Sequence, residues 1–176
     1  MVGYILRSDM KTCSNTAYLT AKAFKRMWLI RRLKYLGAST TQLIDSLQKQ
    51  VLSVLWLGAP AWYYLLTQSE KQDIDRVAKV GLKIIYGDTY QGFENALLSS
   101  GIRKPTLQLE KMTYQFAKKC SGHEKFSKWF APVPERVHTR GNKKQIYVNI
   151  ATRTERFRQS AIPQLTYILN KQTSLI

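Results

Sequence analysis

The amino-acid sequence predicts a mainly α-helical protein, with a short β-strand at its start and a basic, largely extended tail at its end. Its 176 residues, 44% of them hydrophobic, are enough to form one domain with a core. Apolar side chains recur at helical spacing in segments that end at glycine, whereas prolines and cations replace them near the C-terminus. We therefore expect three parts: residues 1–12, 13–130 and 131–176.

The first part is the predicted strand. Residues 1–8, "MVGYILRS", are rich in β-forming side chains and have no preceding strand to pair with. Because a domain seldom begins in this way, we expect the chain to start inside a longer protein. A helix follows, which is capped by Ser14 or Asn15 and ends where Gly37 can adopt the left-handed conformation.

Two further helices follow the first. One is predicted to run up to the Gly-Ala-Pro sequence at residues 58–60, which breaks it. Thr67 and Glu70 then match a capping box, which opens a helix that ends at Gly87. Five residues lie on the apolar stripes of these segments, and we expect them to share one core: Trp28, Trp62, Ile74, Val77 and Ile84.

Four shorter helical segments complete the prediction. Residues 92–101 and 106–122 have helical periodicity, and each segment ends at a glycine. Residues 125–130 add one turn. Residues 161–170 form a short amphipathic helix with a proline near its first position. The expected architecture is thus a helical bundle followed by a tail with one terminal helix.

The net charge of +17, from 28 Lys and Arg against 11 Asp and Glu, is the main functional signal of the composition. Residues 1–57, 58–122 and 123–176 carry net charges of +7, +3 and +7, so we expect the two ends to be the contact surfaces. A positive field of this strength attracts polyanions, either nucleic acid or an anionic membrane surface.

Cysteine usage and hydropathy bear on the compartment. Cys13 and Cys120 are far apart and form no Cys-x-x-Cys pair, which argues against a disulfide framework and favours a reducing compartment. The apolar runs are too short to cross a membrane, and no signal peptide is visible. We expect an intracellular protein, in either the nucleus or the cytoplasm.

The first helix combines six Lys and Arg residues, within residues 22–40, with aromatic and aliphatic side chains. On a helical wheel one stripe is apolar, and we expect it to be buried: Ala17, Ala21, Phe24, Trp28 and Tyr35. A neighbouring arc is cationic, and we expect it to contact phosphates: Lys22, Lys25, Arg26 and Arg32. Two alternatives stay open, a charged face that is simply solvated and a helix that lies on a membrane surface.

The tail repeats this combination of cations and aromatic side chains. Its basic residues are Arg140, Lys143 and Lys144, then Arg153, Arg156 and Arg158, interleaved with Tyr147 and Phe157. Arginine forks match phosphate oxygens, and aromatic faces stack on unpaired bases. The alternative is a flexible tail with no ligand.

The sequence offers no self-sufficient active site. Asp73 and Asp75 are two residues apart on a helix and point to different faces, so they cannot converge on metal ions. Cys120, His123 and His138 have only half of a zinc-knuckle spacing. No Gly-rich phosphate loop and no Gly-x-Ser-x-Gly motif is present. We therefore expect no catalytic residue, no metal site and no cofactor in this chain.

The order of short motifs over about residues 2–170 resembles the C-terminal part of the reverse transcriptase of jockey-like non-LTR retrotransposons. The segments that carry the resemblance are, in order, "GYILRSDMKTCSN", "KRMWLIRRLKYLGAS", "KQVLSVLWLGAPAW", "IDRVAKVGLKIIYG", "FENALLSSGI", "FAKKC" and "TRTERFRQSAIPQLTYILN". The shared order and spacing make the resemblance specific, although no single segment does.

The resemblance implies that the initial strand is the end of the palm subdomain and that the helices form a thumb and its downstream extension. The thumb is expected to grip the duplex of template and primer. Five residues correspond to the basic helix of the family: Lys25, Arg26, Arg31, Arg32 and Lys34. Trp62 corresponds to a packing aromatic, and Arg76 and Lys79 correspond to cations of a later helix. Mg²⁺ is expected only in the intact polymerase, with its palm and fingers.

The chain also departs from the family pattern. The paired catalytic aspartates are absent, Gln108 and Leu109 stand in place of an Arg-Arg doublet, and Ala78 stands where Gln is frequent. We therefore expect sequence-independent binding of RNA or DNA and no polymerase activity, no membrane partner and no small-molecule substrate. The expected binding residues are Lys22, Lys25, Arg26, Arg31, Arg32, Lys34, Arg153, Arg156 and Arg158. The alternative is a helical protein-interaction module, or a decayed element, with no nucleic-acid role.

Overall fold

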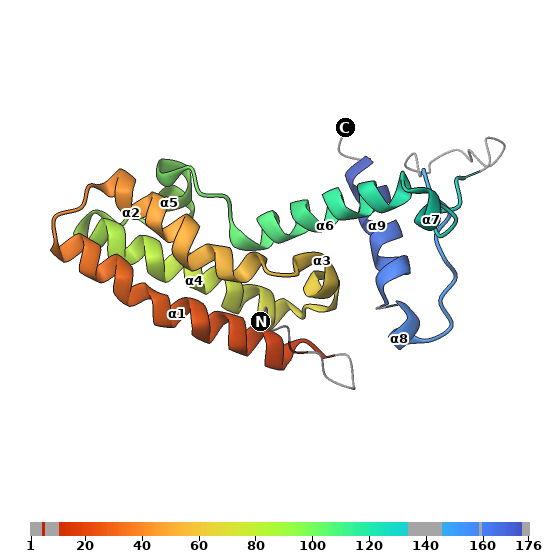
Figure 1. Ribbon diagram of the computed structural model, residues 1–176, viewed down its shortest axis with the longest axis horizontal. Coiled ribbons are helices and arrows are strands. Elements are labelled where there is room, and N and C mark those ends of the chain that lie inside the picture. The colour runs from red at the N-terminus through yellow and green to blue at the C-terminus, as the bar shows by residue number, and fades with distance from the viewer. Residues whose placement is uncertain (1–4, 6–10, 134–145, 159, 174–176) are drawn as a thin grey trace. The chain divides into compact units, whose positions relative to one another are not determined.

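The computed structural model describes residues 5, 11–133, 146–158 and 160–173, and these residues are mainly helical (Figure 1). The predicted α-helical class is therefore confirmed. The expected strand at residues 1–8 lies, apart from Ile5, outside the described residues. The chain divides into two compact units: Met1–Trp62 with Leu66–Leu109, and Tyr63–Leu65 with Glu110–Ile176.

The first unit contains two long helices, α1 (Cys13–Tyr35) and α4 (Gln68–Tyr86), which lie side by side (Figure 1). Helix α2 (Thr40–Ser46) continues into a π-helical turn (Leu47–Val51) and a 3-10 turn (Leu52–Trp56). The other helices are α3 (Ala59–Trp62), α5 (Phe93–Ser100) and the beginning of α6 (Pro105–Ser121). The buried side chains of this unit include Leu19, Ala23, Met27, Ile30, Leu47, Val51, Leu55, Trp62, Ile74, Val77 and Leu82.

The ends of α1 are set by local backbone chemistry. Its N-cap is Thr12, so the helix begins slightly earlier than the predicted caps at Ser14 or Asn15. At the other end Gly37 has a φ of +81°, and its N–H donates to the Lys34 carbonyl at 3.0 Å while the next N–H donates to the Leu33 carbonyl at 3.1 Å. This pair of bonds is a Schellman motif, and it confirms the predicted stop.

The buried side of α1 differs from the prediction. Trp28 is 62% exposed and Tyr35 is 81% exposed, so the expected apolar stripe lies on the outer side of the helix and Trp28 is not a core residue. The inner side is formed instead by Leu19, Ala23, Met27 and Ile30. Apolar side chains occur on both sides of this helix, and the polar residues at its start belong to the inner side because Glu70 of α4 binds them.

Glu70 joins the beginnings of α1 and α4. Its Oε2 accepts from the Thr67 N–H and hydroxyl, both at 2.8 Å, which completes the predicted capping box. Its Oε1 accepts from the hydroxyls of Thr12 at 2.8 Å and Thr16 at 3.1 Å. Burial raises the pKa of the Glu70 carboxyl, but these hydrogen bonds outweigh burial, and the pKa lies below its ordinary value.

Lys34 joins the other ends of the same two helices. Its ammonium donates to the carbonyls of Ile84 at 2.7 Å and Ile85 at 3.0 Å, which lie in the last turn of α4. The carbonyls there have no partner within the helix, and the helix dipole favours a cation at this end. Helices α1 and α4 are thus fastened at both ends and run in the same direction.

Of the four other residues that were expected in the core of this unit, three are fully buried and one is not. Trp62, Ile74 and Val77 are buried, and the Trp62 indole donates to the Leu57 carbonyl at 2.8 Å. Ile84 is only half-buried, because Leu82 and Ile85 occupy the inner side of the last turns of α4.

The second unit contains the end of α6, α7 (Glu124–Ser127), α8 (Glu155–Arg158) and α9 (Ala161–Thr173). Its core consists of Ala117, Cys120, Phe130, Leu165 and Leu169. Residues 131–133 and 146–154 form no helix, and an isolated antiparallel bridge joins Pro132 to Tyr147. Helix α9 is longer than the predicted terminal helix, and its Leu165 and Leu169 belong to this core. The C-terminal helix is therefore an integral part of the second unit.

Candidate nucleic-acid interface

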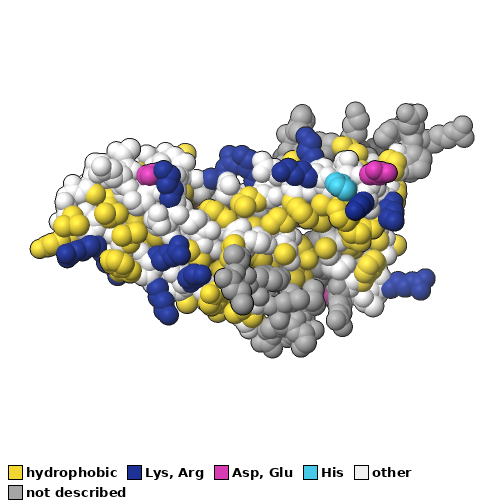
Figure 2. Space-filling model, in the orientation of Figure 1, with side chains coloured by type: hydrophobic (Ala, Val, Ile, Leu, Met, Phe, Trp, Pro, Cys, Tyr) yellow, Lys and Arg dark blue, Asp and Glu magenta, His cyan; other side chains and the backbone are white. Residues whose placement is uncertain are grey.

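The outer side of α1 is a cationic surface. The sequence contains no acidic residue between Asp9 and Asp45, so α1 carries no carboxylate of its own. Lys25, Arg31 and Arg32 are exposed, and none of them lies within ion-pair distance of a carboxylate in the described part of the chain. Figure 2 shows that Lys and Arg side chains are widespread on the face drawn there, whereas Asp and Glu side chains are sparse.

The other predicted cations of α1 already have contacts within the first unit. Arg26 Nη1 donates to the Gln50 carbonyl at 2.7 Å, and Lys34 is bound at the end of α4. The Lys22 ammonium lies 5.6 Å from the centre of the Tyr18 ring. Of the six predicted binding residues on α1, Lys25, Arg31 and Arg32 are exposed and their side chains have no hydrogen bond or ion pair to another described residue, although Arg32 has a ring contact like that of the half-buried Lys22.

Four residues on the outer side of α1 line a shallow depression of about 380 Å³, and we call them the α1 aromatic surface: Trp28, Arg31, Arg32 and Tyr35. The Arg32 guanidinium lies 5.7 Å from the centre of the Tyr35 ring. This surface was not predicted from the sequence, because both aromatic rings were expected on the buried side of the helix. The sequence does contain a signal for it: Arg31 and Arg32 are three or four residues from both Trp28 and Tyr35, so all four side chains lie on one side of the helix.

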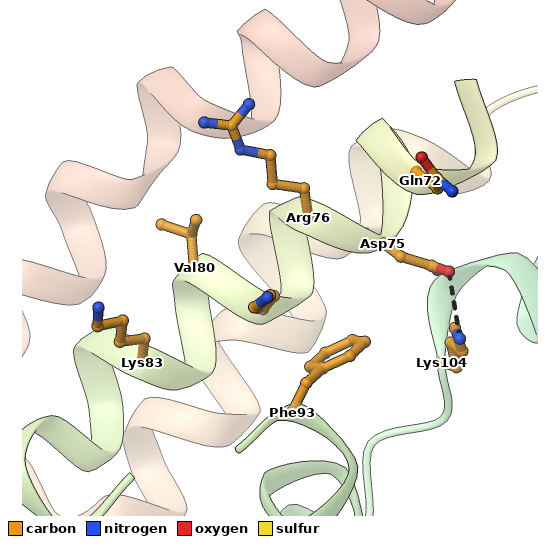
Figure 3. Close-up of a pocket in the computed structure, with 8 residues that line it drawn as sticks. Gln72, Asp75, Arg76, Val80, Lys83, Phe93 and Lys104 are labelled. Carbon is orange, nitrogen blue, oxygen red and sulfur yellow. Dashed lines mark ion pairs between the residues drawn. The ribbon is translucent and has the colours of Figure 1, made fainter. Parts of the chain in front are cut away.

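A second cationic surface lies on α4, and Phe93 of α5 and Lys104, just before α6, border it (Figure 3). It forms a pocket of about 500 Å³ lined by Gln72, Asp75, Arg76, Lys79, Val80, Lys83, Phe93 and Lys104. Lys104 lies 3.7 Å from the Asp75 carboxylate and 3.9 Å from Glu94. No carboxylate of the described residues lies within ion-pair distance of Arg76, Lys79 or Lys83. The two cations that the resemblance pointed to therefore line one pocket.

Asp75 has a structural role in that pocket. Its carboxylate accepts from the Thr106 N–H and hydroxyl, both at 3.0 Å. Burial raises the pKa of Asp75 above its ordinary value, although these hydrogen bonds and Lys104 oppose the rise. Asp73 on the same helix is exposed, so the two carboxylates do not face one ion.

The predicted arginines of the tail belong to the second unit. Arg153 is exposed, and Arg158 pairs with Glu155 at 2.7 Å. The backbone of Arg156 lies in α8, but its side chain is outside the described residues. Arg140, Lys143 and Lys144 also lie outside them. Of the two tail arginines whose side chains are described, Arg153 is therefore the one that is exposed and has no ion pair.

The described residues contain no group of three His, Cys, Asp or Glu side chains that could hold a metal ion. Cys120 lies in the core of the second unit, where burial raises the pKa of its thiol. His123 caps α7, because its Nδ1 accepts from the Lys125 N–H at 3.2 Å. His138 is outside the described residues. Across the described ranges, no helix combines the length and apolar character that crossing a membrane requires.

Comparison of the chain with protein-family models, with curated proteins and with solved structures finds no match. The resemblance to non-LTR reverse transcriptases therefore rests on the order of short motifs alone. The geometry of α1 provides an argument about function that does not depend on it.

Proposed function

We propose that the chain binds nucleic acid without sequence preference, through backbone contacts made by the outer side of α1. The observation that carries this proposal is the exposure of Lys25, Arg31 and Arg32 on a helix with no acidic residue. Cations held at a protein surface without carboxylate partners attract phosphates, and backbone contacts of this kind position a protein without selecting bases.

The spacing on α1 suits a phosphate backbone. Lys25 and Arg32 are seven residues, or two turns, apart, so they lie on the same side of the helix about 10 Å apart along its axis. Arg31 lies beside Arg32 and adds a planar fork that can bind a phosphate through two hydrogen bonds. A strand that follows the helix axis can therefore contact all three side chains.

We further propose that this chain corresponds to the thumb and downstream part of a non-LTR retrotransposon reverse transcriptase. The support is the order of motifs in the sequence and the cationic pocket that Arg76 and Lys79 line on α4. In this proposal the chain contributes grip on template and primer. The palm and fingers of the parent polymerase, with Mg²⁺, contribute the chemistry.

A second candidate function is protein interaction through the helical surface. The observation that favours it is the exposure of large apolar side chains on the first unit, above all Leu36 and Leu98. Association driven by apolar burial depends weakly on salt, whereas phosphate neutralisation releases counterions and makes binding fall steeply with salt. Salt dependence therefore separates the two functions.

The test compares two triple variants with the same loss of charge. The first variant changes Lys25, Arg31 and Arg32 to glutamine. The control changes three exposed lysines of the second unit to glutamine: Lys118, Lys119 and Lys128. Binding to a short mixed-sequence DNA duplex is measured by fluorescence anisotropy over a range of salt concentrations, and circular dichroism confirms that both variants stay helical.

We expect the first variant to bind more weakly and to flatten the slope of log K against log salt by about 2–3. The control should flatten the slope much less. Equal slopes in the two variants would show that overall charge, and not α1, is responsible. If changing Arg153 and Arg158 flattens the slope while the α1 variant does not, nucleic-acid binding stands but lies on the second unit.

A further inference from the structure

The α1 aromatic surface has a composition that phosphate binding alone does not explain. Trp28 and Tyr35 are 62% and 81% exposed, although α1 already buries other apolar side chains on its inner side, namely Leu19, Ala23, Met27 and Ile30. Large aromatic side chains lose favourable burial when they stay in water. Their outward position is therefore best explained by a ligand that covers the rings.

The two rings are arranged along one line. Trp28 and Tyr35 are seven residues apart, so they lie on the same side of α1 about 10 Å apart along its axis. Stacked bases are about 3.4 Å apart and cover one another's faces, so a strand that places one base on each ring must be unstacked there. Arg31 and Arg32 lie between the rings along the sequence and can bind the phosphates of the intervening nucleotides.

From this arrangement we infer that the α1 aromatic surface binds unpaired nucleotides, so the chain prefers single-stranded RNA or DNA to a duplex. This inference rests on the proposed function and specifies its ligand. The flat faces of Trp28 and Tyr35 stack on bases, a contact that every base can make. In a duplex the faces of the bases are covered by their neighbours, so the rings add affinity only for an unpaired strand.

The charge of the surface decides between nucleic acid and a protein partner. Each aromatic ring has an arginine within one turn, and the Arg32 guanidinium lies against the Tyr35 ring at 5.7 Å from its centre. An aromatic groove that is flanked by arginines and lacks carboxylates matches a ligand in which flat apolar groups alternate with anions. A nucleic-acid strand has this pattern, because a base and a phosphate alternate in every nucleotide.

The depression formed by the surface also fits this ligand. Its volume of about 380 Å³ lies within the range of small-molecule sites, which is about 300–1,000 Å³. It is lined by one helix and open to solvent, so it cannot enclose a ligand. An open platform accepts any base, which agrees with binding that does not depend on sequence.

The experiment uses the full chain with one labelled oligonucleotide of mixed sequence, either single-stranded or annealed to its complement. The first variant changes Trp28 and Tyr35 to leucine, which keeps apolar area and helix propensity but removes the flat faces. In a second variant, Trp28→Phe keeps an aromatic face. The control is Tyr167→Leu, because Tyr167 is 60% exposed and lies on α9 of the second unit.

We expect the unmodified chain to bind the single strand more tightly than the duplex. The double leucine variant should lose about 5- to 150-fold or more in affinity for the single strand, the range that removal of one stacked base predicts, and should keep its affinity for the duplex. Trp28→Phe should retain most of the single-strand affinity, and Tyr167→Leu should leave it unchanged.

Three results would overturn the inference, and they differ in what they mean for the proposed function. Equal affinity of the unmodified chain for single strand and duplex refutes the preference, while salt-dependent binding through the α1 cations still stands. Single-strand binding that survives the leucine changes assigns the rings to another partner, such as a protein. Absence of binding to both oligonucleotides refutes the inference and the proposed function together.

Discussion

Replacing Glu70 by glutamine tests how α1 and α4 are held together. Glutamine keeps the shape of the side chain, but its amide offers one acceptor oxygen where the carboxylate offers two, so it cannot accept both from Thr67 and from the Thr12 and Thr16 hydroxyls. The lost bonds involve a charged acceptor, and a hydrogen bond to a charged group contributes about 1.5–3 kcal/mol. Because the threonine hydroxyls that face the amide nitrogen can turn and accept from it, we expect a loss of about 2 kcal/mol.

The pH dependence of this loss identifies its origin. Burial raises the pKa of Glu70, but hydrogen bonds from the threonines outweigh burial and leave the pKa below its ordinary value. A carboxyl group with a lowered pKa stabilises the fold fully above its ordinary pKa, and this contribution is lost as pH falls through the folded-state pKa. The difference in unfolding free energy between Glu70→Gln and the unmodified chain should therefore be largest near neutral pH and narrow in acid.

The measurement is urea unfolding followed by circular dichroism, repeated between about pH 7 and about pH 3. Asp73→Asn is the control, because Asp73 is an exposed carboxylate on the same helix. We expect the control to stay within about 0.5 kcal/mol of the unmodified chain. A Glu70→Gln loss that is the same at both ends of the pH range would show that the charge of Glu70 does not support the joint.

Two further stability predictions concern α4. Gly81→Ala should lower the unfolding free energy by about 1–3 kcal/mol, because the added Cβ would lie 2.5 Å from Cδ1 of the buried Leu47. This cost should exceed the gain from the better helix propensity of alanine. Thermal unfolding at an unchanged or higher temperature would show that Leu47 moves aside at no cost. Leu82→Ala should cost about 2–5 kcal/mol and Ile84→Ala about 1 kcal/mol, since Leu82 is fully buried and Ile84 is half-buried. Equal losses in denaturant unfolding would mean that Leu82 and Ile84 are equally buried, and that the inner side of α4 is not the one described.

The helix ends were predictable because they depend on neighbours in the sequence. Gly37 and the capping box of Thr67 with Glu70 act over three or four residues, so the sequence pattern contains the whole motif. Gly101, in the left-handed conformation at the end of α5, is a third example. In each case the backbone bonds that end or begin the helix are made within the motif itself.

The orientation of α1 was not predictable, because it depends on a partner far away in the sequence. Thr16 lies on the inner side through its bond to Glu70, which is 54 residues away. The helical wheel places Trp28 on the buried side, and this assignment is wrong because Trp28 is exposed. The packing of α9 was missed for a related reason, since Leu165 and Leu169 find their partners in the distant helix α6.

The candidate binding residues were predictable as residue types but not in their roles. The sequence identifies the cations of α1 by composition and spacing. It does not show that Arg26 binds a carbonyl 24 residues away or that Lys34 binds carbonyls at the end of α4. Which cations stay available to a ligand is decided by these tertiary contacts, and so is the exposure of the α1 aromatic surface.

The joint at Glu70 has a consequence for the response of the protein to ionic strength. In this joint the carboxylate is held by three threonine side chains and one backbone N–H, and no cation takes part in the hydrogen bonds that the structure gives it. Buried hydrogen bonds are screened by salt much less than contacts between exposed charges. The same salt concentrations that release a polyanion from the outer side of α1 should therefore leave its inner side in place. A salt titration of this protein then reports on ligand release while the first unit stays folded.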